Sequence, residues 1–220
     1  MIAVGVDLER SRQAVALAER HPEVWAGAGH HPEDHTQPDL VALRELAAHP
    51  RIVVIGEIGL DFVDEAGPAK EAQIARLHDL FTIAVDLDLP VSIHNRGASE
   101  ALADAIAPHP GLRGVMHYFA LEWNWAERFL ELGFHLSFAG LVTRPSRDAL
   151  REVVMRCPPE RLLLETDAPY GNAHKRMGVQ NRPAYLIDTA ELVSELRGIS
   201  LQELADLELS NALRLFTRMT

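Results

Sequence analysis

Four side chains of the types that bind metal ions stand at the ends of short apolar runs. Glu57 lies in VVIGEIGLD, His94 ends PVSIH, His117 ends GVMH and Asp167 lies in LLLETDAP. Imidazole nitrogens and carboxylate oxygens together suit divalent ions that assist hydrolysis, such as zinc, manganese or magnesium. Any one of these residues alone has an ordinary structural explanation. Their joint placement on four predicted strands favours a metal site, and we expect one or two divalent ions per chain.

Spacing within the predicted strands adds candidate neighbours to these ligands. Residues two apart in an extended chain point to the same side, so Arg96 is expected beside His94 and Glu165 beside Asp167. A guanidinium next to a metal ligand suits a phosphate group, because its parallel N–H groups match the phosphate oxygens. Glu165 is expected to orient a ligand or a water molecule. The alternative is that Glu165 forms a purely structural salt bridge with Arg96.

The other histidines divide by their position in the sequence. His31, which precedes Pro32, is expected to reach the substrate, whereas His30 is expected to face the helical layer. His135 opens a predicted strand, so we expect it at the opposite end of the fold from the site. The sequence lacks the motifs of other common catalytic and binding sites. It has no Gly-rich phosphate loop, no G-x-S-x-G motif and no C-x-x-C pair.

Strands and helices alternate along the sequence and must position these side chains. The predicted strands are Ile2–Asp7, Val24–His31, Ile52–Asp61, Pro90–Arg96, Gly114–Phe119, His135–Gly140 and Leu162–Pro169. Predicted helices cover residues 11–20, 70–87, 99–107, 122–132, 146–156, 183–196 and 200–216. The last helix opens with Ser200 and Glu203, which are spaced as a capping box. No domain boundary is visible, and we expect a single domain over residues 1–220.

Alternation of strands and helices predicts parallel strands joined by helical crossovers, which leaves an open doubly wound sheet or a barrel. A barrel brings the C-terminal ends of all its strands to one face, whereas an open sheet gathers ligands mainly where the strand order reverses. Reactive groups at the ends of so many strands converge easily only in a barrel. We therefore predict an α/β fold of the TIM-type (β/α)8 barrel class, with seven strands, one short of closure.

Composition limits the classes of protein and of partner. Hydrophobic residues make up 47% of the chain, and no apolar run reaches the length of a membrane span. The net charge of −11 argues against coating long stretches of duplex DNA, which needs clustered Lys and Arg. It leaves room for an enzyme that meets phosphate at a metal-containing pocket. The one cysteine fits a reducing compartment, so we expect a cytoplasmic protein, and no obligate protein partner can be inferred.

Motifs along the whole chain resemble those of the TatD-type metal-dependent deoxyribonucleases of the amidohydrolase superfamily. These are GHHP (29–32), IGEIGLDF (55–62), LPVSIHNR (89–96), VMHYF (115–119), GFHLSFAGLV (133–142), LLLETDAPY (162–170) and SNALRLF (210–216). The resemblance implies a (β/α)8 barrel and metal-dependent hydrolysis of DNA ends or single strands, typically exonucleolytic. It implies that Glu57 is shared between two metals and that His94 and His117 bind one of them. It implies further that Asp167 binds the other metal and activates water.

Departures from the family pattern concern the first strand and the substrate. The family opens with a strand carrying D-x-H-x-H, whose histidines bind metal, whereas this sequence begins at MIAVGVDLERS, which resembles the second strand. A start codon assigned too late, a truncation or a partner chain at the edge would each account for this, and we favour the first. HNRG, HYFAL and NRP replace the usual HSRD, HCFSG and NEP, which leaves the substrate open.

The function expected from the sequence is a metal-dependent deoxyribonuclease that hydrolyses phosphodiester bonds. Glu57 and Asp167 are its expected catalytic groups, and Arg96 and His31 are expected to hold the phosphate. One alternative is a hydrolase of the same superfamily that cleaves a small-molecule ester, lactone or amide. Another is a catalytically impaired barrel that lacks half of its metal site.

Overall fold

The computed structural model describes residues 1–63 and 65–219. Its strands are β1 Ile2–Val4, β2 Trp25–Ala28, β3 Ile52–Asp61, β4 Val91–Arg96, β5 Gly114–Met116, β6 His135–Phe138 and β7 Leu162–Leu164. Its α-helices are α1 Leu8–Arg20, α2 Leu40–Ala47, α3 Lys70–Asp86, α4 Ser99–Ile106, α5 Trp123–Glu131, α6 Asp148–Arg156, α7 Leu186–Arg197 and α8 Leu201–Leu215. The chain forms two compact units. The first comprises Met1–Val115 and the segment from Leu215 onward, and the second comprises Met116–Arg214.

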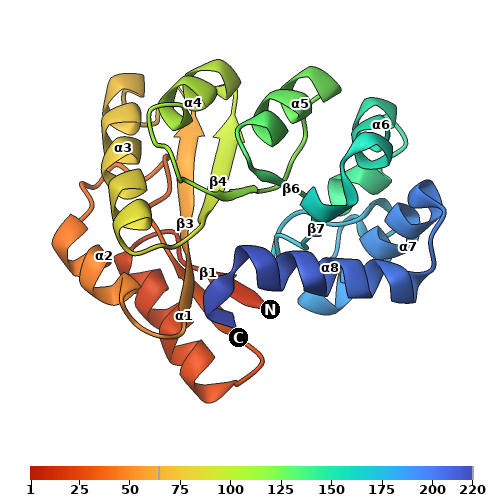
Figure 1. The fold of residues 1–220 in the computed structure, drawn as a ribbon, viewed down its shortest axis with the longest axis horizontal. Coiled ribbons are helices and arrows are strands. Elements are labelled where there is room, and N and C mark those ends of the chain that lie inside the picture. The colour runs from red at the N-terminus through yellow and green to blue at the C-terminus, as the bar shows by residue number, and fades with distance from the viewer. Residues whose placement is uncertain (64, 220) are drawn as a thin grey trace. The chain divides into compact units, whose positions relative to one another are not determined.

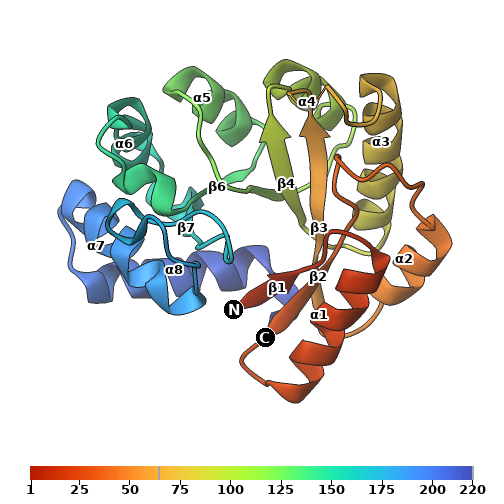
Figure 2. The ribbon, with the colours of Figure 1, turned by 180° about the vertical axis from the view of Figure 1, so that it is seen from behind.

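The first unit is built on the parallel strands β1 to β4, which follow one another in sequence order. Ile2 pairs with Trp25, and Ile55 pairs with Val91. Strand β3 is the longest, and all its side chains except that of Glu57 are buried. In Figures 1 and 2 it lies beside β4, with α3 and α4 next to the two strands. A strand buried on both faces reads as a continuous apolar run, which is why its bounds could be predicted.

In the second unit, strands β6 and β7 pair in parallel, with Leu136 opposite Leu162 and Phe138 opposite Leu164. Helices α5, α6 and α7 belong to this unit, together with most of α8. Helix α8 begins with the predicted capping box: the Ser200 N–H donates to Glu203 Oε2 at 2.8 Å, and the Glu203 N–H donates to Ser200 Oγ at 3.2 Å. The capping-box prediction is therefore confirmed.

All seven predicted strands are present among the described residues, but most are shorter than predicted. Strand β7 ends at Leu164, so Glu165 and Asp167 lie in the loop that follows it. His117 likewise comes directly after β5 and His31 three residues after β2. The prediction that the strands extend through these four residues was wrong. The chain leaves the sheet before them, so they lie in the loops that follow the strands.

One helix of the structure was not predicted. Helix α2 spans eight residues, and the Asp39 side chain caps it by accepting a hydrogen bond from the Ala42 N–H at 3.0 Å. Only Leu43 and Ala47 of this helix are buried. The helix has only eight residues, about two turns, which is too short for a helical periodicity to stand out in the sequence. No helix in the described residues is long and apolar enough to cross a membrane.

Candidate metal centre

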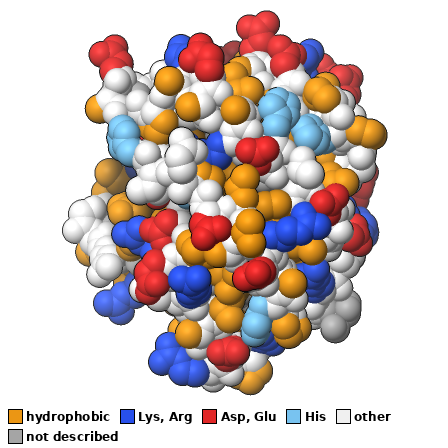
Figure 3. Space-filling view, turned by 90° about the vertical axis from the view of Figure 1, so that its left-hand side faces the viewer, with side chains coloured by type: hydrophobic (Ala, Val, Ile, Leu, Met, Phe, Trp, Pro, Cys, Tyr) orange, Lys and Arg blue, Asp and Glu red, His pale blue; other side chains and the backbone are white. Residues whose placement is uncertain are grey.

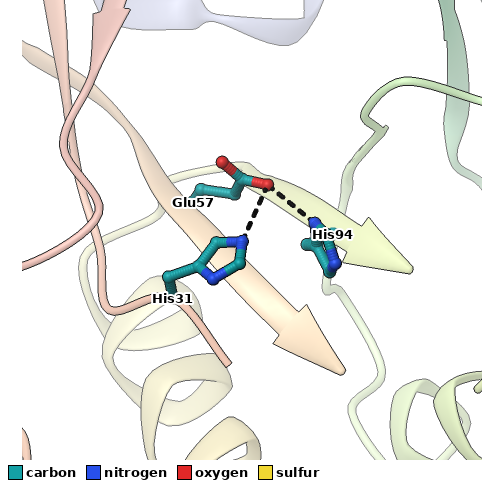
Figure 4. Close-up of side chains that lie close together, drawn as sticks. All are labelled: His31, Glu57 and His94. Carbon is teal, nitrogen blue, oxygen red and sulfur yellow. Dashed lines mark hydrogen bonds and ion pairs between the residues drawn. The ribbon is translucent and has the colours of Figure 1, made fainter. Parts of the chain in front are cut away.

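Three side chains of the first unit, His31, Glu57 and His94, form a cluster of potential metal ligands. Glu57 Oε1 lies 3.0 Å from His94 Nδ1 and 3.5 Å from His31 Nε2. Figure 4 shows both imidazole rings directed toward the same carboxylate oxygen. The three side chains are between 16 and 20% exposed, so the cluster is sheltered but still open to an ion.

The donor set of this cluster fits a divalent metal ion. One ligand atom from each residue lies within 4.8 Å of the other two, which is the spacing of atoms around a single ion. Two imidazole nitrogens and one carboxylate oxygen are ligands that zinc, manganese and related ions accept. The His31–Glu57–His94 cluster could therefore hold a metal ion, and the nature of the ion is left open by the ligand types.

A buried carboxylate lies behind His94. Asp61 ends β3, its side chain has no exposed surface, and its Oδ2 lies 3.0 Å from His94 Nε2. Burial lowers the pKa of His94, but hydrogen bonds and the negative charges of Glu57 and Asp61 outweigh this and raise the pKa above 6.5. Because Nε2 is taken by Asp61, Nδ1 is the nitrogen that faces Glu57 and a metal ion. This is the arrangement in which a carboxylate fixes the orientation of a ligating histidine.

Glycines allow the backbones that carry these ligands to approach closely. A Cβ at Gly29 would lie 2.3 Å from the carbonyl carbon of Gly56 and 2.5 Å from the backbone nitrogen of Glu57. A Cβ at Gly59, where φ is +149°, would lie 2.0 Å from the backbone oxygen of His94. The glycines of the GHHP and GEIGLD motifs are thus steric requirements, because any side chain would push a ligand-bearing segment away.

Arg96 lies next to the His31–Glu57–His94 cluster. Its Nη1 is 3.7 Å from Asp61 Oδ2 and 3.8 Å from Glu33 Oε1, and its side chain is 57% exposed. The predicted proximity of Arg96 and His94 is confirmed, since both contact the same carboxylate. Both distances are long and the Arg96 side chain is mostly exposed, so neither carboxylate holds the guanidinium tightly. The guanidinium is therefore available to an anionic group.

The second unit contains a separate cluster, formed by His117, Glu165 and Asp167. His117 Nδ1 lies 2.7 Å from Glu165 Oε1, and His117 Nε2 lies 3.6 Å from Asp167 Oδ1. Glu165 Oε1 also accepts a hydrogen bond from the Tyr118 N–H at 2.8 Å. Glu165 and Asp167 thus contact the same imidazole, which agrees with their predicted proximity.

Asp167 of this second cluster, and Tyr118 next to His117, have left-handed backbone conformations. The φ angle is +58° at Asp167 and +47° at Tyr118. Such conformations cost about 1–3 kcal/mol for non-glycine residues and concentrate at functional sites. The Asn181 side chain holds the Asp167 loop by donating a 2.7 Å hydrogen bond to the backbone oxygen of Thr166. Asn181 is a buried residue, so its hydrogen bond holds the loop from the protein interior.

The sequence matches the family of TatD related DNases over residues 1–217. This chain belongs to that family. It is 34% identical over 221 residues to YabD of Bacillus subtilis strain 168, named as an uncharacterized metal-dependent hydrolase, covering 98% of this chain and 86% of YabD. It is 36% identical over 229 residues to the 3'-5' ssDNA/RNA exonuclease TatD of Rahnella sp., with the same coverage of each chain.

A solved structure supports the same assignment for this TatD-family chain. The crystal structure of YjjV, a TatD homolog from Escherichia coli K12, matches with a TM-score of 0.91 and 32% sequence identity over 98% of this chain and 85% of YjjV. The predicted α/β fold of the TatD and amidohydrolase barrel type is thus confirmed, with seven strands in the described residues. The protein is a metal-dependent hydrolase of the TatD family.

Sequence reasoning missed one residue of the TatD-family site and gave another a different role. Asp61 was not predicted, although it lies four residues after Glu57 on the same strand and so faces the same side. His31 was expected to touch substrate, and the structure places it against Glu57 as a candidate ligand. His30 contacts Arg76 of helix α3, as expected. His135 is the first residue of β6, whereas Asp167 follows the last residue of β7.

Proposed function

We propose that this protein is a metal-dependent nuclease that hydrolyses phosphodiester bonds in DNA, acting on ends or single strands. The observation that carries this proposal is the His31–Glu57–His94 cluster, a sheltered nitrogen and oxygen ligand set in a chain of the TatD family. The relative named as a 3'-5' ssDNA/RNA exonuclease supports a nucleic-acid substrate and exonucleolytic action.

The proposal assigns metal-ligand roles to Glu57, His94, His117 and Asp167, with His31 added by the structure. A divalent ion bound by such groups lowers the pKa of water and offsets the charge that develops on phosphate. Asp167, which is 28% exposed, accepts the proton of the attacking water. Its carboxylate lies 3.6 Å from His117 Nε2, so the two side chains are close enough to act on the same water molecule.

Substrate recognition is assigned to Arg96. Its exposed guanidinium presents parallel N–H groups that match two oxygens of a phosphodiester. The net charge of −11 and the mixture of acidic and basic side chains on the face seen in Figure 3 fit local recognition of phosphate. A protein that coats nucleic acid would instead present clustered Lys and Arg.

Digestion of a single-stranded DNA oligonucleotide in the presence of Mn²⁺ or Mg²⁺ tests the proposal. The wild type is expected to shorten the oligonucleotide from one end, and Glu57→Ala to lose this activity. Glu45→Ala, which removes an exposed carboxylate on helix α2, is the matched control and is expected to keep it. A wild type no faster than Glu57→Ala would contradict the nuclease assignment. Metal-dependent cleavage of small esters or lactones by the same preparation would then favour a small-molecule hydrolase of this superfamily.

A further inference from the structure

His31 differs from the other two members of its cluster in how the chain carries it. Glu57 lies on β3 between the paired residues Ile55 and Ile58, and His94 lies on β4 opposite Gly59, so the pairing of the two strands holds both segments. Residues 29–39, which include His31, form neither helix nor strand. The position of the His31 imidazole therefore depends on whatever holds this loop.

The guanidinium of Arg76, on helix α3, occupies the centre of this loop. Arg76 is a buried residue, only 7% exposed. Its Nη2 donates to the backbone oxygen of Pro32 at 2.8 Å, and its Nη1 donates to those of Asp34 at 2.8 Å and Thr36 at 3.3 Å. One side chain thus binds three carbonyl groups within the five residues that follow His31.

His30 completes the contacts of this guanidinium. Its Nε2 lies 3.0 Å from Arg76 Nη1 and 3.1 Å from the backbone oxygen of Thr36. The ring and the guanidinium thus meet at the same carbonyl group of the loop. Burial, and then the positive charge of Arg76, lower the pKa of His30, in agreement with a neutral ring. His30 and Arg76 together bind the loop to α3 at the residue before His31.

We propose that Arg76 is a positioning residue for the metal centre, which acts by holding the loop that presents His31 to Glu57. This inference rests on the proposed function, in which His31 is a metal ligand. Three buried or partly buried carbonyl groups would lose the same donor together if the guanidinium were removed, and His30 would lose its neighbour. Groups that orient metal ligands typically change metal affinity about 10–100-fold when they are mutated.

The test measures binding of Mn²⁺ to metal-free protein by calorimetric titration, with thermal unfolding of the same samples. Arg76→Met keeps most of the apolar part of the side chain. It is expected to lower the affinity for the Mn²⁺ ion that His31 binds by about tenfold or more. Arg76→Lys keeps the charge but supplies a single nitrogen, so a smaller loss is expected. Arg44→Met is the matched control, since the Arg44 side chain is exposed and pairs with the exposed Asp86, and no loss is expected.

A double-mutant cycle distinguishes positioning from general stability. If Arg76 acts through His31, Arg76→Met changes the Mn²⁺ affinity in the wild type but not in His31→Ala. An equal loss in both backgrounds would overturn the inference, and so would an unchanged affinity in Arg76→Met. If Arg76→Met does not fold, the same cycle with Arg76→Lys decides by the same criterion. An unchanged affinity in His31→Ala would instead refute the proposed metal centre itself, which is a separate failure.

Discussion

The imidazole of His94 is held between two carboxylates, with Nδ1 3.0 Å from Glu57 Oε1 and Nε2 3.0 Å from Asp61 Oδ2. The two carboxylates differ in surroundings, since Glu57 is partly exposed and Asp61 is fully buried. A buried carboxylate that accepts from one ring nitrogen fixes the tautomer and leaves the other nitrogen free for a metal ion. Asp61 is therefore the residue that decides which nitrogen of His94 faces the site.

Replacing Asp61 by asparagine should weaken metal binding without changing the shape of the side chain. We expect Asp61→Asn to lower the affinity for Mn²⁺ about 10–100-fold, because the ligand loses its orienting charge. The pKa of His94 in the metal-free protein should also fall, since Asp61 contributes to raising it. Calorimetric titration and the NMR titration of the histidine ring measure these two effects. Asp86→Asn, at an exposed ion pair on α3, is the control, and an unchanged affinity in Asp61→Asn would contradict the role given to Asp61.

Glu165 has the corresponding role for His117 in the second unit. Its Oε1 accepts from His117 Nδ1 and from the Tyr118 N–H, so it fixes both a ring and the backbone beside it. We expect Glu165→Gln to keep the fold and to slow oligonucleotide cleavage about 10–100-fold. Cleavage rates at saturating Mn²⁺ measure this effect, with the exposed Glu160→Gln as control. A wild-type rate in Glu165→Gln would show that the contact is purely structural.

The bounds of strand β3 could be predicted from the sequence to the residue. The contact of its buried carboxylate, Asp61, with His94 could not. Ile52–Asp61 was predicted from a continuous apolar run, and the structure has the same bounds. Within this run Glu57 was recognised as a ligand, whereas Asp61 was not. The side chain of Asp61 is buried because β4 brings His94 and Arg96 against it. Pairing between strands decides this, and a single strand contains no information about its partner.

The direction of the His31 side chain could not be predicted from the sequence, for a related reason. His31 follows a glycine-containing motif and precedes a proline, which predicts a turn but not the direction of the imidazole. The direction depends on Arg76, which is 45 positions further along the chain and has no motif of its own. In a helical sequence an arginine normally indicates a solvent-exposed face. Tertiary contacts, which the pattern does not contain, make Arg76 a buried support.

Gly59 should tolerate no side chain. Its φ of +149° already disfavours other residues, and a Cβ would lie 2.0 Å from the backbone oxygen of His94. We expect Gly59→Ala to lower the free energy of unfolding by at least about 3 kcal/mol. Gly111 also has a positive φ, +91°, but nothing lies within 4 Å of its Cβ position. Gly111→Ala should therefore cost only about 1–2 kcal/mol, and denaturant unfolding of both variants measures the difference. Equal costs would show that the close approach to β4 is unimportant.

A half-buried glutamate in the second unit should make stability depend on pH. Both carboxylate oxygens of Glu208, on α8, lie 3.0 Å from the Leu164 backbone nitrogen at the end of β7. Burial raises the pKa of Glu208 to about 8 despite this hydrogen bond, and the negative charge of Glu165 adds to the rise. The protonated form is thus favoured in the folded protein compared with the unfolded chain, where the pKa is near 4.5.

The sign of the effect follows from this difference in pKa. Below pH 4.5 Glu208 is protonated in both states, and its contribution to stability is fully present. As the pH rises from 4.5 through 8, the unfolded chain releases the proton first, so the free energy of unfolding falls. Glu208→Gln, which keeps an acceptor for Leu164 but cannot ionise, should flatten this decline and be more stable than the wild type at pH 8. Urea unfolding at several pH values measures both curves, with the exposed Glu195→Gln as control. Parallel curves for the wild type and Glu208→Gln would show that Glu208 does not titrate in this range.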